Sequence, residues 1–216
     1  MNLTKAVSAA FAASILAVAS PAFAEQPQTI TISSRVIPQY VSGDLIGCQL
    51  GFEVARSDPE FSNGELVYLT GNIGFKAFEG KELAFTMKLG ASNVSSPGIF
   101  LPPAEAFLIS GYTSNKSDFL SSMPGEEGFQ LFVYSAGETT FEAAVNNIIQ
   151  NNEFSFAYAM RPGGLNAVVP VDLRVERLDF DNPEHSRMSE KSSQDWAACM
   201  EATLGAAIER LEKVPD

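Results

Sequence analysis

Apolar residues recur at every second position through much of this chain, and this period limits the folds that the chain can adopt. The clearest run is Ile46, Cys48, Leu50, Phe52 and Val54, with small or polar residues between them. Successive side chains of a β-strand point to opposite faces, so a period of two predicts a strand with one buried face. Such strands suit an antiparallel sheet that packs on one side only.

The same period returns along the chain, and short runs of turn-forming residues separate its occurrences. The connections Glu79-Gly80 and Pro162-Gly163-Gly164 are typical of hairpin turns. The sequence therefore predicts a mainly β, α+β fold, built as an antiparallel β-sandwich or a strongly curved sheet. Besides the run above, we expect strands in residues 29–37, 65–77, 83–89, 129–133, 154–160 and 167–175.

Two segments have helical spacing instead. In an internal segment, Thr139 and Glu142 have the spacing of a capping box, and one apolar stripe follows. A C-terminal helix, about 192–212, is expected to start near Ser192 and to bury a stripe of its own. The internal stripe is Phe141, Ala144, Val145, Ile148 and Ile149, and the terminal one is Trp196, Cys199, Met200, Leu204, Ala207, Ile208 and Leu211.

The first 24 residues have the three-part build of a secretory signal. Lys5 precedes an apolar run at 6–18, which is too short to span a bilayer, and the small-residue triplet Ala22-Phe23-Ala24 follows. We predict cleavage before Glu25 and a single β-rich domain, residues 25–216, in the periplasm or outside the cell. No stable membrane insertion is expected after cleavage. An uncleaved membrane anchor is the alternative.

The chain has two cysteines, Cys48 and Cys199. Cys48 lies on the apolar face of a predicted strand, and Cys199 lies on the apolar stripe of the terminal helix. Disulfides persist in the oxidising compartment to which a signal peptide delivers a chain. We therefore predict a Cys48–Cys199 disulfide that ties the last helix to an early strand. Two separate buried thiols are the alternative.

The formal net charge of the chain is −12, from 26 acidic residues against 14 Lys and Arg. Such a surface repels phosphate backbones and anionic lipid headgroups, which makes nucleic acid and membrane surfaces poor partners. The hydrophobic content of 45% argues against a disordered chain.

The sequence carries no motif of a known catalytic class. Its one histidine, His185, lies in a polar loop, and the chain has no nucleophile elbow, phosphate-binding loop or dinucleotide-binding glycine pattern. We predict no cofactor and no histidine-dependent, hydride-transfer or nucleotide-hydrolysing activity. A pair of catalytic carboxylates leaves no sequence motif, so a carboxylate-dependent hydrolase stays open.

The loop around His185 also contains Asp179, Asp181 and Glu184. Oxygen and nitrogen ligands of this kind bind Ca²⁺ or Zn²⁺ in other proteins. The spacing fits no EF-hand loop, and a short acidic run is usually a solvated linker. We predict no metal site, and these four residues are the weak candidates for one.

An apolar triplet, Ile99, Phe100 and Leu101, is framed by Pro97 on one side and by Pro102 on the other. Proline disfavours a central strand, so the triplet is expected in a loop that is either buried or offered to a partner. We take the three residues as a candidate partner-binding site.

These observations predict a secreted or periplasmic protein that binds or interacts without catalysis, with a protein as its expected partner. Two alternatives remain. A carboxylate-dependent hydrolase of the cell envelope would show a deep cleft that holds two close acids. A structural subunit of an envelope assembly would show an unpaired strand edge.

Overall fold

The computed structural model describes residues 28–58, 65–77, 83–96 and 98–212, and for 207–212 it describes the backbone only. The predicted signal segment with its cleavage site at Glu25 lies outside the described residues. The expected turn at Glu79-Gly80 and the framing residue Pro97 also lie outside them.

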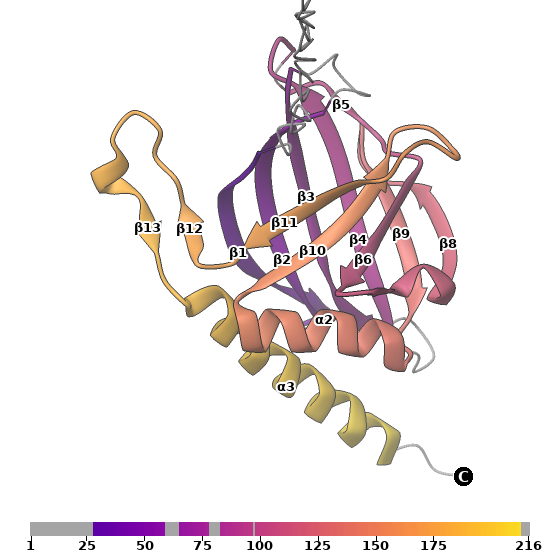
Figure 1. The fold of residues 1–216 in the computed structure, drawn as a ribbon. Coiled ribbons are helices and arrows are strands. Elements are labelled where there is room, and N and C mark those ends of the chain that lie inside the picture. The colour runs from indigo at the N-terminus through magenta and orange to yellow at the C-terminus, as the bar shows by residue number, and fades with distance from the viewer. Residues whose placement is uncertain (1–27, 59–64, 78–82, 97, 213–216) are drawn as a thin grey trace, which may run out of the picture.

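One long antiparallel sheet contains most of the strands (Figure 1). Neighbouring strands pair in a regular register along most of their length, and the two-residue strand β5 (Phe100–Leu101) pairs with the end of β4. In spatial order the strands are β1 (Thr29–Val41), β2 (Asp44–Ser57), β3 (Leu66–Ala77), β4 (Leu83–Asn93), β9 (Gln130–Ser135) and β8 (Phe119–Pro124).

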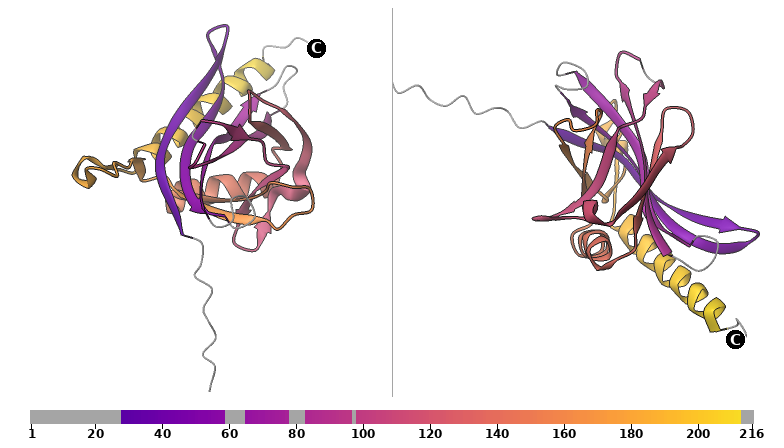
Figure 2. Two further views of the ribbon diagram at one scale, coloured as in Figure 1. Left: turned by 90° about the horizontal axis from the view of Figure 1, so that it is seen from above. Right: turned by 90° about the vertical axis from the view of Figure 1, so that its right-hand side faces the viewer.

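A second, smaller antiparallel sheet faces the inner side of the curved large sheet (Figures 1 and 2). Its strands, in spatial order, are β11 (Ala167–Asp172), β10 (Glu153–Ala159), β6 (Glu105–Ser110) and β7 (Thr113–Ser114). A third pair, β12 (Val175–Arg177) and β13 (Arg187–Met188), forms an arm that projects from the body. The short 3₁₀ turns η1 (Asn115–Asp118) and η2 (Pro183–His185) precede β8 and β13.

Two helices complete the fold. Helix α2 (Glu138–Asn151) lies across one end of the two sheets and contacts β6 and β10, and α3 (Lys191–Glu212) packs on β2 (Figure 1). The mainly β, α+β fold with antiparallel sheets, one internal helix and one C-terminal helix is confirmed. Within the described residues, neither helix is long and apolar enough to cross a membrane.

Aromatic side chains fill the space between the sheets. The ring of Phe52 lies 5.3 Å from that of Phe154 and 5.2 Å from that of Phe156, so β2 packs directly on β10. The ring of Phe75 lies 5.3 Å from that of Phe85 and 6.3 Å from that of Trp196. The alternation in the sequence thus gives the large sheet its buried inner face, and α3 adds Trp196 to the same core.

The predicted capping box of the internal helix is wrong. Thr139 lies inside α2, whose N-cap is Gly137 with no side-chain cap. Asp118 of η1 provides the cap instead, because its Oδ2 accepts hydrogen bonds from the backbone nitrogen and the hydroxyl of Thr140, at 3.1 and 2.7 Å. This cap comes from 22 residues earlier in the chain, where a local pattern cannot indicate it.

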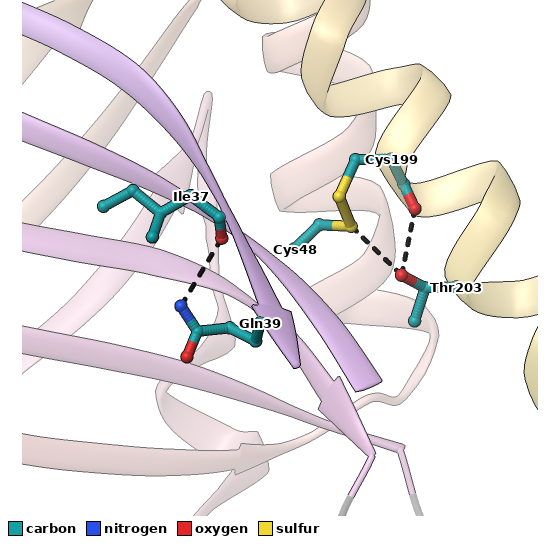
Figure 3. The surroundings of a disulfide bond; sticks show 5 residues. All are labelled: Ile37, Gln39, Cys48, Cys199 and Thr203. Atoms are coloured by element: carbon teal, nitrogen blue, oxygen red, sulfur yellow. Dashed lines mark hydrogen bonds between the residues drawn. A yellow bond between two sulfur atoms is a disulfide. The ribbon is translucent and has the colours of Figure 1, made fainter. Parts of the chain in front are cut away.

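The Cys48–Cys199 disulfide is confirmed, with 5.9 Å between the two Cα atoms and a sequence separation of 151 (Figure 3). The hydroxyl oxygen of Thr203 lies 3.0 Å from the sulfur of Cys48 and donates a hydrogen bond to the carbonyl oxygen of Cys199 at 2.9 Å. The bond fastens α3 to the inner face of β2. A disulfide fits a non-cytoplasmic, oxidising compartment.

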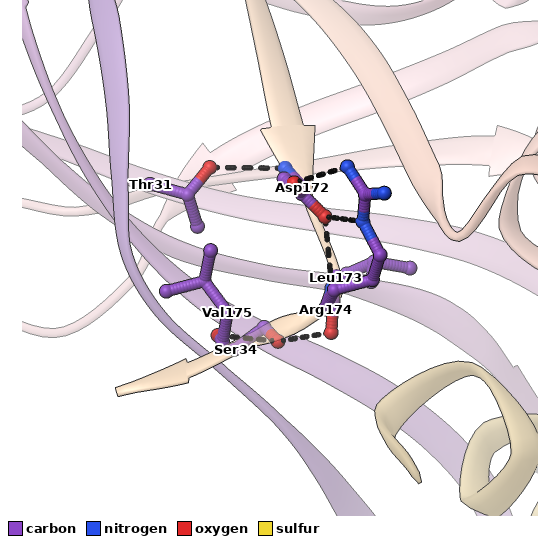
Figure 4. A network of polar contacts seen from close by, with 6 residues as sticks. All are labelled: Thr31, Ser34, Asp172, Leu173, Arg174 and Val175. Carbon is purple, nitrogen blue, oxygen red and sulfur yellow. Dashed lines mark hydrogen bonds and ion pairs between the residues drawn. The ribbon is translucent and has the colours of Figure 1, made fainter. Parts of the chain in front are cut away.

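The two sheets are joined on the β1 side by polar contacts (Figure 4). The hydroxyl oxygen of Thr31 accepts a hydrogen bond from the backbone nitrogen of Asp172 at 2.9 Å. The hydroxyl of Ser34 lies 3.0 Å from the carbonyl oxygens of both Leu173 and Val175. These contacts join the two sheets on the β1 side. A different set of contacts is found on the opposite side, between β6 and β8.

Candidate interaction site at the open edge of strand β8

Strand β8 ends the large sheet, and in the described part of the chain no strand pairs with its outer edge. All of its six residues are exposed, and none of them is charged. Natural proteins usually protect such an edge with charged side chains, a bulge or a covering element. The one bulge of β8 lies near Phe119, and its one proline, Pro124, is its last residue. Most of the strand is therefore free to pair with a further strand.

The edge of β6 that faces β9 is closed by side chains. The hydroxyl of Tyr134 donates a hydrogen bond to the carbonyl oxygen of Ala106, and the backbone nitrogen of Leu108 donates one to Oδ1 of Asn115 at 2.8 Å. Burial, with a smaller contribution from the nearby carboxylate of Glu105, raises the pKa of Tyr134 far above its usual value. The hydroxyl of Tyr134 therefore keeps its proton, and stays a donor, into the alkaline range. Along β8, by contrast, no strand pairs with the outer edge in the described part of the chain.

A pocket of about 260 Å³, which we call the seam pocket, lies between β6 and β8. Lys116 closes part of its rim: its Nζ lies 2.8 Å from Oε2 of Glu105 and 5.1 Å from the ring centre of Phe107. The hydrogen bond from Lys116 lowers the pKa of Glu105. The pocket is otherwise largely aromatic, lined by Phe107, Phe119, Phe132 and Tyr134.

A second apolar hollow, which we call the outer pocket, lies on the other side of β8 and has a volume of about 590 Å³. Leu120 and Met123 of β8 line it and are 61% and 45% exposed. Leu83, Val133 and Ala136 line its remaining wall. Apolar hollows thus lie on both sides of the same open strand. Because the side chains of an added strand would alternate between the two faces, both hollows would receive them.

Acidic residues stand at both ends of β8. Asp118 precedes the strand and caps α2, and Glu126 and Glu127 follow it. Lys88 pairs with Glu126, with 2.8 Å between Nζ and Oε2, and this contact lowers the pKa of Glu126. Strand β8 is thus uncharged, and carboxylates stand at both of its ends.

The predicted partner-binding triplet lies elsewhere, beside β4. Ile99 and Leu101 are 66% and 49% exposed. Phe100 is half-buried, with its ring centre 4.8 Å from that of Phe129. None of the three lines the seam pocket or the outer pocket. A role of this triplet in partner binding stays a prediction.

The weak metal candidates do not come together. Asp179 uses Oδ1 to accept hydrogen bonds from the backbone nitrogens of Asp181 and Asn182, at 3.1 and 3.0 Å, so it shapes the turn of the projecting arm. Glu184 and His185 are exposed in η2. Among the described residues, no group of three or more His, Cys, Asp or Glu side chains is arranged to hold a metal ion.

Sequence reasoning missed β8 because the strand buries neither face and therefore shows no alternation. One signal was available: an uncharged stretch from Phe119 to Pro124 between the acidic residues Asp118 and Glu126. Its position at a sheet edge depends on long-range pairing, which the sequence does not reveal.

Comparison with models of protein families, with curated proteins and with solved structures finds no match for this chain. Function is therefore inferred from the chemistry of the site itself.

Proposed function

We propose that this chain is a periplasmic or secreted, non-catalytic interaction protein that binds an extended segment of a partner protein along β8. The observation that carries the proposal is an unprotected strand edge with an apolar hollow on each of its two faces. Strand addition uses these features together: main-chain hydrogen bonds provide affinity, and pockets for alternate side chains provide specificity.

The chemistry of β8 defines the expected partner segment. Its backbone is extended, its side chains enter the seam pocket and the outer pocket alternately, and its middle is apolar. Each added hydrogen bond contributes a net stabilisation of about 0.5–1.5 kcal/mol, so burial in the two pockets supplies much of the affinity. The carboxylates of Asp118, Glu126 and Glu127 favour a segment without acidic flanks.

The proposed compartment has two lines of support. The disulfide between Cys48 and Cys199 fits an oxidising environment. The first 24 residues have the composition of a secretory signal.

The seam pocket gives no support to the carboxylate-dependent hydrolase. A general acid of that class needs a raised pKa, whereas Lys116 lowers the pKa of Glu105, the acidic residue that lines this pocket. The open edge of β8 also suits the other alternative, a structural subunit that pairs with a second copy of itself. The experiment below distinguishes a foreign partner from a second copy.

The test places a photo-crosslinking amino acid at Ser122 in the exported protein, irradiates the cells and identifies the crosslinked peptide by mass spectrometry. We expect a crosslink to one extended, apolar segment of another protein. Leu120→Lys should abolish it without changing the melting temperature, because Leu120 is exposed and a charge opposes strand addition.

Leu66 is the matched control, because it is also an exposed leucine but lies on β3, which β4 and β9 separate from β8. A crosslinker at Leu66 should give no such product, and Leu66→Lys should leave the Ser122 crosslink intact. Crosslinking to a second copy of the chain would favour the assembly subunit. Equal products at both positions, or a crosslink that survives Leu120→Lys, would contradict binding at β8.

A further inference from the structure

We propose that a polar groove on the outer face of the large sheet binds a small zwitterion, a molecule with a carboxylate and a protonated amine a few bonds apart. The groove has a volume of about 150 Å³ and lies over β1 to β4; Phe129 also lines it, and no residue of β8 does. This site is independent of the function proposed above.

Strand register places the groove residues together. Arg35 lies opposite Gly51, and Gly51 lies opposite Asn72 on the next strand. In the adjacent row, Ser33 lies opposite Glu53, which in turn lies opposite Thr70. Residues two apart on a strand share a face, so both rows point away from the core.

Gly51 lets the side chain of Ile37 lie directly against the sheet in the groove. A Cβ atom at this position would lie 2.8 Å from Cδ1 of Ile37, so no side chain fits without displacing Ile37. The side chain of Ile37 therefore covers Gly51, and it lines the groove together with Arg35 and Asn72.

Two opposite charges in the groove are free. Arg35 and Glu53 are both exposed and both line the groove, yet within the described residues neither forms an ion pair with the other or with a third group. They are diagonal neighbours on adjacent strands, a separation of about 7–8 Å that leaves room for a small molecule between them. Lys88, at the far end of the groove, is already bound to Glu126 at 2.8 Å.

Asn72 adds an unused acceptor. Its Oδ1 is buried and has no hydrogen-bond partner among the described residues. Most buried polar atoms in proteins have a partner, so an orphaned acceptor in the wall of a groove suggests a missing donor. A protonated amine held by Glu53 would supply that donor.

These groups determine where the carboxylate and the amine of the ligand bind. The guanidinium of Arg35 presents paired N–H donors that match a carboxylate. The carboxylate of Glu53 and the Oδ1 of Asn72 accept hydrogen bonds from the amine, and the hydroxyls of Ser33 and Thr70 lie beside Glu53. A cavity of about 150 Å³ can hold a molecule the size of benzene, so a groove of this volume suits a ligand the size of a small amino acid.

The experiment titrates disulfide-bonded protein with L-alanine and follows amide shifts by NMR and heat by calorimetry. Acetate and methylammonium each carry one of the two charges, and N,N,N-trimethylglycine carries both but has no N–H donor. We expect saturable binding of L-alanine, with shifts confined to residues around Arg35, Glu53 and Asn72, and at least tenfold weaker binding of the other three.

Arg35→Gln and Glu53→Gln should each weaken L-alanine binding at least tenfold, and neither should alter the fold because both side chains are exposed. Arg187→Gln, at an exposed arginine of the projecting arm, should leave binding unchanged. No saturable shift with L-alanine would overturn the proposal. Equal binding of acetate and L-alanine with no effect of Glu53→Gln would also overturn it, because the groove would then be a simple anion site.

Discussion

Tyr134 donates its hydroxyl hydrogen bond to the carbonyl oxygen of Ala106, and this contact links the two sheets across the floor of the seam pocket. Both residues are buried. Tyr134→Phe keeps the ring but leaves the carbonyl of Ala106 without its donor. We expect the free energy of unfolding, measured by urea denaturation, to fall by about 1–3 kcal/mol.

The control for this variant is Tyr40→Phe, which removes the same hydroxyl from a side chain that is 62% exposed. It should change the free energy of unfolding by less than about 0.5 kcal/mol. An equal loss of unfolding free energy in both variants would show that the hydrogen bond between Tyr134 and Ala106 does not stabilise the contact between the two sheets.

The disulfide gives a second prediction. Cys199→Ser frees α3 from β2 and removes a crosslink that closes a loop of 151 residues. The chain-entropy model puts the loss of stability at up to about 5 kcal/mol, and measured values are often lower.

Thermal melts of the oxidised protein, the reduced protein and Cys199→Ser measure this loss. Limited proteolysis should cut α3 first in both forms without the bond. An unchanged melting temperature, or cleavage that begins elsewhere, would mean that packing around Trp196 alone holds the helix.

A third prediction concerns acid. Two hydrogen bonds from the side chain of Arg174, at 2.7 and 2.9 Å, lower the pKa of Asp172 below its ordinary value of 3.8. A carboxyl group whose pKa is lower in the folded state stabilises the protein above its unfolded pKa, and this stabilisation is lost as the pH falls through the folded pKa.

Asp172→Asn should therefore be less stable than the parent at pH 7, and this difference in stability should shrink as the pH falls below 3.8, the ordinary value. Urea denaturation at several pH values measures it. If the free energies of unfolding of Asp172→Asn and the parent differ by the same amount at every pH, ionisation of the Asp172 carboxylate is not the cause of the difference.

The fold was predictable where one face of an element is buried. The alternation around Cys48 predicted β2, and the stripe that contains Trp196 predicted α3 to within one residue of its observed start at Lys191. The disulfide followed from the same faces, since both cysteines were expected to point into the core. An element that buries one face in the core places its apolar residues on that face. The resulting period is visible in the sequence and predicts the element.

The candidate sites were not predictable in the same way. Strand β8 has no buried face, and its open edge depends on pairing with β9. The helix cap from Asp118 and the groove over Gly51 both depend on residues that are distant in the chain. Helix α2 also buries Thr140 and Ala143, whereas Phe141 and Ile149 of its apolar stripe are 39% and 49% exposed. Packing against β6 and β10 sets this orientation.

The last prediction concerns Phe100 in the proline-framed segment. Its ring packs on Phe129, with 4.8 Å between ring centres, and the side chain is half-buried on the outer face of β4. Phe100→Ala should lower the free energy of unfolding by about 1–2 kcal/mol, because an aromatic pair contributes about 0.5–1.5 kcal/mol beyond its buried area. A fully buried phenylalanine would cost about 3–5 kcal/mol.

Ile99→Ala is the companion variant, because Ile99 is 66% exposed and should change stability by less than about 0.5 kcal/mol. Urea denaturation of both variants separates packing from partner contact. If the segment contacts a partner, Ile99→Ala should weaken the complex, measured by calorimetry with the purified partner, while stability stays constant. A loss of 3 kcal/mol or more from Phe100→Ala, on the order expected for a core residue, together with an unaffected complex in Ile99→Ala, would assign the segment to packing alone.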